Sequence, residues 1–143
     1  MDMNNGLQQS KKLNKLNSEF LKIHHQKIRS LRRKTQELLS HMYSDLPHAI
    51  CLSELHLKAS ELSFVNIESY TIKAQFSRAL HEGGGVITYV HNSLKFINID
   101  LSEYCQEKDI EICVIKIKSN ALSLCSLSLY RAPQAILPIY YKI

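Results

Sequence analysis

Glu54 is the residue whose type and position most clearly suggest chemistry, and it lies within the stretch A-I-C-L-S-E-L-H-L at residues 49–57. The apolar run before it is typical of a strand that is buried on both faces. A carboxylate at the end of such a strand is costly unless it is paired with a cation or holds a metal. Ligand and metal sites of layered α/β proteins also gather where strands end. Glu54 is therefore a candidate metal ligand; the alternative is a strand-end residue that marks the exit into solvent.

The histidines, cysteines and glycines offer no comparable site. His24 and His25 are adjacent in an alternating stretch, so their side chains would point to opposite faces and could not hold one ion together. The run Gly83-Gly84-Gly85 lacks the Lys-Ser/Thr of a P-loop and opens a β-branched strand, so we interpret it as a permissive turn. The cysteines form no C-x-x-C pair and lie mainly in apolar runs, which favours a reducing, intracellular setting: Cys51, Cys105, Cys113 and Cys125.

Positive charge is concentrated at the start of the chain. Residues 1–34 hold nine of the 18 Lys and Arg side chains but only two of the 13 acidic ones. A basic front end suits a polyanion such as nucleic acid, although a solubilising tail with one solvated helix face explains the charge equally well. The candidate nucleic-acid-binding residues are Lys22, Arg29, Arg32, Arg33 and Lys34.

Two features of the chain bear on its location in the cell. No apolar segment approaches the length of a membrane span, and residues 1–12 lack the apolar core of a signal peptide. We therefore expect an intracellular protein, nuclear or cytoplasmic, without a membrane partner.

Hydrophobic patterning predicts an α/β protein that begins with a β-α-β unit after a basic, polar tail at residues 1–19. Strands are expected at Phe20–Lys27 and Ala49–Ser53, on either side of a helix with an apolar stripe from Leu31 to Tyr43. Ser30 has the side chain of an N-cap, because its hydroxyl can accept from the free amides of the next turn.

The later part of the chain is predicted to consist mostly of antiparallel strands. Two of these strands, joined by a turn at Ser119-Asn120, are typical of a hairpin. In the second strand of that hairpin the apolar phase shifts at Cys125-Ser126, which indicates either a β-bulge or burial on both faces. The four predicted strands are Tyr70–Phe76, Val86–Val90, Asp109–Lys118 and Ala121–Tyr130.

Four separated motifs occur in the order and spacing of one family. They are I-H-H-Q-K-I-R-S-L-R-R-K (Ile23–Lys34), A-I-C-L-S-E (Ala49–Glu54), G-G-G-V-I-T-Y-V (Gly83–Val90) and L-Y-R-A-P (Leu129–Pro133). With these motifs the chain resembles the N-terminal part of the endonuclease/exonuclease/phosphatase-like (apurinic-endonuclease-like) domain of non-LTR, LINE-like, jockey-type retrotransposon polyproteins. The resemblance defines a partial domain at residues 20–134 and leaves residues 135–143 as a tail that does not match.

The resemblance implies a four-layer α/β sandwich and an enzyme that nicks target DNA with a divalent cation, usually Mg²⁺. In such an enzyme Glu54 matches the metal-binding glutamate, and Tyr130 matches the active-site tyrosine that opens the Tyr-Arg-x-Pro motif. Lys27, however, stands where the family has a metal-site asparagine. A cation there would repel a metal ion, and we expect Lys27 to pair with Glu54 instead.

The family's later motifs, Gly-Asp-x-Asn and Ser-Asp-His, do not follow Pro133, and residues 134–143 contain no acid and no histidine. We therefore expect a partial sandwich without its C-terminal half, with sheet faces left uncovered, and a frameshift or premature stop as its origin. The leading hypothesis is a truncated relict of the endonuclease without nicking activity and with weak Mg²⁺ binding at best. The alternatives are the front part of an active endonuclease/reverse-transcriptase polyprotein and a non-catalytic remnant that binds DNA.

Overall fold

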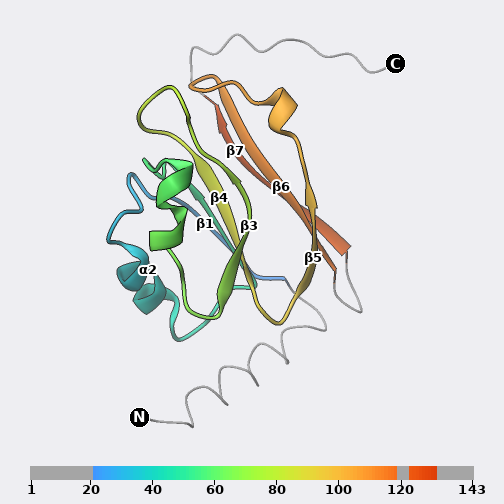
Figure 1. Ribbon diagram of the computed structural model, residues 1–143. Coiled ribbons are helices and arrows are strands. Elements are labelled where there is room, and N and C mark those ends of the chain that lie inside the picture. Colours follow the sequence, from blue (N-terminus) through green and yellow to red (C-terminus); the bar gives the residue numbers. More distant parts are fainter. Residues whose placement is uncertain (1–20, 119–122, 132–143) are drawn as a thin grey trace.

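The structure of the protein is a computed structural model that describes residues 21–118 and 123–131. Two β-sheets pack face to face, and the helices at residues 35–42 and 59–64 lie on the far side of the first sheet (Figure 1). The described part of the chain is thus mixed α/β and mostly strand. The predictions for residues 1–19, for residues 135–143 and for the turn at Ser119-Asn120 concern segments outside the described residues.

The first sheet has the strand order β1-β2-β4-β3 and contains the predicted β-α-β start. β1 (Ile23–Lys27) runs parallel to β2 (Ala49–Ser53), with α2 between them in the sequence. β4 (Val86–His91) pairs antiparallel with both β2 and β3 (Tyr70–Phe76). All five residues of β2 are buried, as the apolar run predicted, because this strand is central in the sheet and covered on both faces.

The helix α2 (Thr35–Met42) begins later than predicted, and Ser30 is not its N-cap. Ser30 has a left-handed backbone (φ 86°), and its N–H donates to the carbonyl of Glu54 at 2.8 Å. The N–H of Leu31 donates in the same way to the carbonyl of Leu55 at 2.9 Å. Backbone pairing between the segments that follow β1 and β2 holds Ser30 in this left-handed conformation, and Arg33 is left-handed as well (φ 63°), so a right-handed helix cannot begin at Ser30.

The first sheet is covered on both faces. On one face Leu38 and Met42 of α2 pack with β-strand residues such as Leu52 and Tyr89, beside the 3-10 helix η1 (Ala59–Phe64). On the other face Val86 and Val90, together with Ala49, meet the second sheet through side chains that include Ile115 and Ile117. The second of these apolar layers holds the two sheets together.

The second sheet has the order β5-β6-β7 and contains the predicted hairpin. β6 (Ile110–Lys118) pairs antiparallel with β7 (Ser123–Arg131) and with β5 (Lys95–Ile99), a strand that the sequence analysis missed. A 3-10 helix, η2 (Ser102–Tyr104), connects β5 towards β6.

The bulge predicted at Cys125-Ser126 is wrong, and so is burial on both faces. The register between β6 and β7 is continuous, so β7 keeps a simple alternation. Ser126 and Ser128 point inward and are buried, whereas Leu127 and Leu129 are 55% and 43% exposed on the outer face. The inward serines are satisfied, because Ser128 Oγ lies 3.0 Å from Thr88 Oγ1 and Ser126 Oγ lies 3.5 Å from Cys51 Sγ.

The cysteines of the described residues are free thiols, and two of them belong to the interior. Cys51 and Cys113 are buried between the sheets, and burial raises the pKa of Cys113 to about 11. Both act as small apolar side chains in the interior, and the raised pKa keeps Cys113 in its thiol form. In the described ranges, no helix has the length and apolar character needed to cross a membrane.

One buried polar side chain has a consequence for stability. His48 is fully buried; its Nδ1 accepts from the N–H of Lys22 at 3.0 Å, and its Nε2 has no hydrogen-bond partner among the described residues. Burial lowers the pKa of His48, and burial together with the nearby His48 lowers the pKa of His91. The folded protein thus holds both rings neutral at pH values where the unfolded chain takes up protons.

We predict that stability falls as the pH is lowered through about 6.5, the ordinary pKa of histidine, because protonation then favours the unfolded chain. Replacing His48 by Asn keeps an acceptor for Lys22 but removes the titrating ring. Urea unfolding at pH 7.5 and pH 5.5 should show a smaller acid-induced loss for His48→Asn than for the parent. His25→Asn, at an exposed position of β1, is the control and should leave the loss unchanged; equal losses in all three chains would contradict the role of His48.

Candidate functional site

The candidate site lies at the edge of the first sheet where β1 and β2 end. Lys27 is the last residue of β1, it pairs in register with Ser53, and Glu54 follows directly. Backbone strain is concentrated here: of the seven described non-glycine residues with positive φ, five belong to the segments that follow β1 and β2, namely Arg29, Ser30, Arg33, Glu54 and His56. Such conformations are uncommon for non-glycine residues and occur more often at functional sites than elsewhere.

Glu54 is paired with Lys27, as the sequence predicted. Lys27 Nζ lies 2.8 Å from Glu54 Oε1, with the lysine side chain 53% exposed and the glutamate side chain 17% exposed. The ammonium group thus pairs with one of the two carboxylate oxygens and approaches it from the solvent side. Because the lysine is half in water, this pair contributes little to stability, at most about 1 kcal/mol.

The residues at this edge do not fit a magnesium ion. Mg²⁺ needs several oxygen ligands in octahedral geometry, and it is repelled by a neighbouring ammonium group. Glu54 offers one carboxylate, already paired, and no three His, Cys, Asp or Glu side chains gather into a metal-binding group anywhere in the part of the chain that the structure describes. No reaction step is therefore assigned to a metal at Glu54.

A second ion pair, which the sequence analysis missed, lies between the two sheets. Arg78 Nε donates to Glu111 Oε2 at 2.6 Å; the arginine side chain is 9% exposed and the glutamate side chain is fully buried. Glu111 also accepts from the N–H of Gly85 at 2.7 Å and from the N–H of Lys108 at 3.1 Å. The carboxylate thus has three donors, which is the condition under which a buried charge is tolerated.

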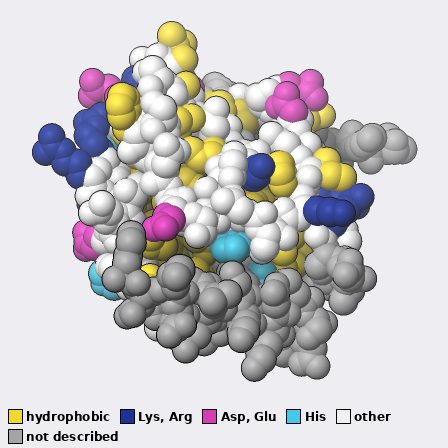
Figure 2. All heavy atoms as spheres, turned by 60° about the horizontal axis from the view of Figure 1, so that its bottom comes forward, with side chains coloured by type: hydrophobic (Ala, Val, Ile, Leu, Met, Phe, Trp, Pro, Cys, Tyr) yellow, Lys and Arg dark blue, Asp and Glu magenta, His cyan; other side chains and the backbone are white. Residues whose placement is uncertain are grey.

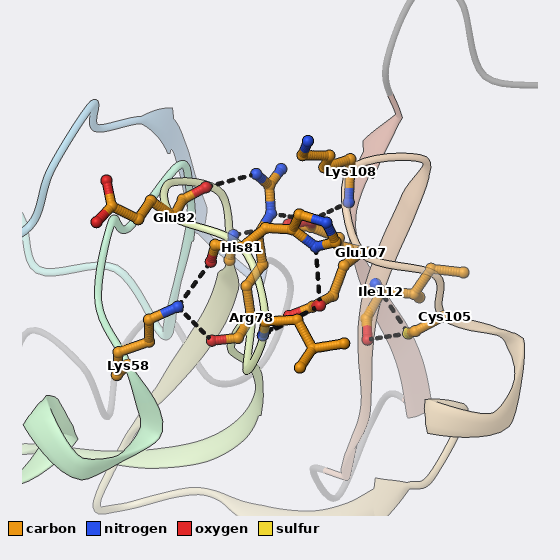
Figure 3. A network of polar contacts seen from close by, with 11 residues as sticks. Lys58, Arg78, His81, Glu82, Cys105, Glu107, Lys108 and Ile112 are labelled. Carbon is orange, nitrogen blue, oxygen red and sulfur yellow. Dashed lines mark hydrogen bonds and ion pairs between the residues drawn. The ribbon is translucent and has the colours of Figure 1, made fainter.

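The loop from β3 to β4, residues 77–85, is anchored from both sides (Figure 3). On one side Lys58 Nζ donates to the carbonyls of Arg78 and His81, at 3.2 and 2.7 Å. On the other side His81 Nδ1 lies 3.0 Å from Glu107 Oε2, and the N–H of Leu80 donates to the same carboxylate. Arg78 Nη1 closes the loop internally by donating to the carbonyl of Glu82 at 2.8 Å.

The glycine run is a turn, as predicted, and its lack of side chains also leaves space for the guanidinium group of Arg78. Gly83, Gly84 and Gly85 all have positive φ. A Cβ at Gly84 would lie 2.1 Å from Arg78 Nε, so a side chain there would displace the guanidinium group from Glu111. The position therefore requires glycine for space as well as for backbone conformation.

Tyr130 belongs to this buried network rather than to the Lys27–Glu54 pair. It is half-buried on the inner face of β7, directly opposite Glu111, and its ring centroid lies 5.8 Å from Arg78 Cζ. No hydrogen bond joins Tyr130 to Glu54. A backbone hydrogen bond from the N–H of His56 to the carbonyl of Gly84, at 2.9 Å, joins the segment that follows Glu54 to the glycine run beside Arg78.

The candidate nucleic-acid-binding residues fall into two groups. Lys22 pairs with Asp45, Arg32 pairs with Glu61, and Lys34 Nζ donates to the carbonyls of Ile28 and Arg29. Arg29 and Arg33 are exposed, and within the described residues their side chains make no hydrogen bond or ion pair. The cations available to a polyanion at this edge are thus those two arginines.

A pocket of about 300 Å³ opens beside the strained segments. Its lining combines the cationic side chains of Arg32 and Lys58 with the carboxylates of Glu61 and Glu82, next to His56. Because its lining carries two cations and two carboxylates, the pocket favours no ligand of one sign.

No protein-family model matches the sequence of this chain, and no curated protein matches it at a significant level. The described residues themselves define a mixed α/β protein with two sheets and few helices.

We predict that Glu111→Gln destabilises the protein by about 3–5 kcal/mol, because it leaves the Arg78 charge buried without its counter-ion. Glu61→Gln breaks the exposed pair with Arg32 and is the matched control, with an expected loss below about 1 kcal/mol. Urea unfolding measures both. The double variant Arg78→Met/Glu111→Leu should be more stable than Glu111→Gln alone, since it removes both charges; equal losses for Glu111→Gln and Glu61→Gln would refute the structural role of the pair.

Proposed function

We propose that this chain is a catalytically silent relative of the endonuclease domain of non-LTR retrotransposons, and that its two sheets correspond to part of the four-layer sandwich of that family. The observation that carries the proposal is the Lys27–Glu54 ion pair. In the family these two positions hold a metal-site asparagine and a metal-binding glutamate. A lysine ammonium 2.8 Å from Glu54 Oε1 takes the place that a cation would need.

Two further observations support the resemblance without depending on the metal. Five of the seven described non-glycine residues with positive φ follow β1 or β2, close to the position where the family has its active site. The tyrosine of the Tyr-Arg-x-Pro motif lies on the inner face of β7, against the buried Arg78. The segments that follow β1 and β2, the glycine run before β4 and the described end of β7 thus lie near one another, which supports the proposal.

Metal-assisted hydrolysis of a phosphodiester needs a cage of oxygen ligands and an oriented nucleophile. We predict that the full chain does not convert supercoiled plasmid into the nicked form in the presence of Mg²⁺ above the background of Glu54→Ala. Agarose-gel conversion assays at several protein concentrations measure this. Cutting by the parent chain that disappears in Glu54→Ala would contradict the proposal and would favour the active endonuclease.

A second candidate function, non-catalytic binding of nucleic acid, is favoured by the two unpaired arginines. Arg29 and Arg33 are exposed on the strained segment that follows β1, and no carboxylate of residues 21–118 or 123–131 pairs with them. Guanidinium groups in this state are suited to phosphate contacts, which carry affinity without reading the sequence.

For this function we predict salt-sensitive binding of duplex DNA by the full chain, measured by fluorescence anisotropy over a range of ionic strengths. Arg29→Ala/Arg33→Ala should weaken binding and lower the slope of log K against log salt by roughly two units, about one for each lost phosphate contact. Lys22→Ala/Arg32→Ala removes two cations that are already paired and should change the slope less. Binding that ignores salt, or a larger effect of the control, would rule out the arginine site.

A further inference from the structure

The outer face of the second sheet is apolar and exposed. On this face Leu127 is 55%, Ile97 45% and Leu129 43% exposed. The register places Leu129 opposite Ile112 and Leu127 opposite Val114, and Ile99 lies on the other side of Val114. The face is thus continuous across β5, β6 and β7; we call it the outer apolar face, and it comprises Ile97, Ile99, Ile112, Val114, Leu127 and Leu129. Val114, at its centre between Ile99 and Leu127, is itself buried.

The alternation of β7 shows that this face is built into the strand. Ser126 and Ser128 occupy the buried side, whereas the leucines between and beside them face outward. Single exposed leucines are ordinary on protein surfaces, whereas a contiguous apolar patch of a few hundred Å² is often functional. With strands about 4.8 Å apart and about 3.3 Å per residue, three strands of five to nine residues present a footprint of roughly 300–400 Å².

The two ends of this face carry opposite charge. At one end lie three lysines, Lys95, Lys116 and Lys118; Lys95 and Lys118 are directly opposite each other in the register, so they repel. Figure 2, which brings the lower end of Figure 1 forward, shows Lys and Arg side chains on the right beside hydrophobic ones. At the other end of the sheet, the residues that flank the strands include three carboxylates, Asp100, Glu103 and Asp109, against two cations, Lys108 and Arg131.

We propose that a second copy of this chain covers the outer apolar face, with the two sheets face to face and related by a two-fold axis across the strands. Sheets pack in this way with their strand directions within about 30° of each other. A two-fold axis reverses one strand direction, so the basic end of each copy meets the acidic end of its partner. The lysine repulsion within one sheet is then compensated by carboxylates of the other copy, which a neutral or basic partner would not provide.

The size of the face determines the strength of this association. Two copies would bury roughly 600–800 Å² between them, which is below the range of stable interfaces and is typical of weak, reversible ones. The proposal therefore predicts a monomer–dimer equilibrium that depends on protein concentration, not an obligate dimer.

Sedimentation equilibrium of the full chain over a wide concentration range tests the apolar part of the proposal. The parent chain should fit a monomer–dimer equilibrium, and Leu127→Ser/Leu129→Ser should weaken the dimer by more than about tenfold. Phe64→Ser/Leu80→Ser is the control, because these side chains are 84% and 85% exposed outside this sheet, and its dimer should match that of the parent. Circular dichroism of each chain confirms that the variants are folded.

Charge reversal tests the two-fold arrangement itself. Lys116→Glu/Lys118→Glu makes both ends of the face acidic, and Glu103→Lys/Asp109→Lys makes both ends more basic, so each variant alone should remain monomeric. Mixed in equal amounts, the two should form a heterodimer, because every contact then joins unlike charges. A parent chain that is monomeric at all concentrations, open-ended oligomers, or a mixture that associates no better than its components would overturn the proposal.

Discussion

The buried pair of Arg78 and Glu111 is the interaction on which the arrangement of this molecule depends. A carboxylate without solvent contact between two sheets must be matched by donors, and here the guanidinium group and two backbone amides supply them. Satisfying Glu111 fixes the path of the loop from β3 to β4, requires glycine at Gly84 and places Arg78 against the ring of Tyr130. One charge thus connects the loop, both sheets and the end of β7.

The Lys27–Glu54 ion pair is far more exposed to solvent than the Arg78–Glu111 ion pair, although both join a basic side chain to an acidic one. Its lysine is half exposed, so its contribution to folding is small and its main effect is electrostatic. It removes one carboxylate oxygen from any cation that approaches the edge where β1 and β2 end. Five non-glycine residues of the neighbouring backbone have positive φ.

The sequence predicted those elements whose local pattern matches their burial. Tyr70–Phe76 has the predicted bounds, and the apolar run of β2 is buried throughout, because alternation and continuous apolarity directly reflect sheet faces. The predicted start of the helix was wrong because Ser30 and Leu31 make long-range backbone hydrogen bonds to Glu54 and Leu55 instead of forming a first helical turn. The sequence could have predicted that Glu111 faces the interior, since period-two alternation places it on the same face as Cys113 and Ile115. Its partner Arg78 is 33 residues away, and no local pattern connects them.

The central claim is that Lys27 stands in the place of a metal at Glu54. The direct measurement is titration with Mn²⁺, a paramagnetic substitute for Mg²⁺, followed by electron paramagnetic resonance of the free ion. The account predicts that Lys27→Asn binds Mn²⁺ more tightly than the parent chain and that Lys27→Asn/Glu54→Ala loses this gain. Binding by the parent chain that already depends on Glu54, and that Lys27→Asn leaves unchanged, would contradict the account.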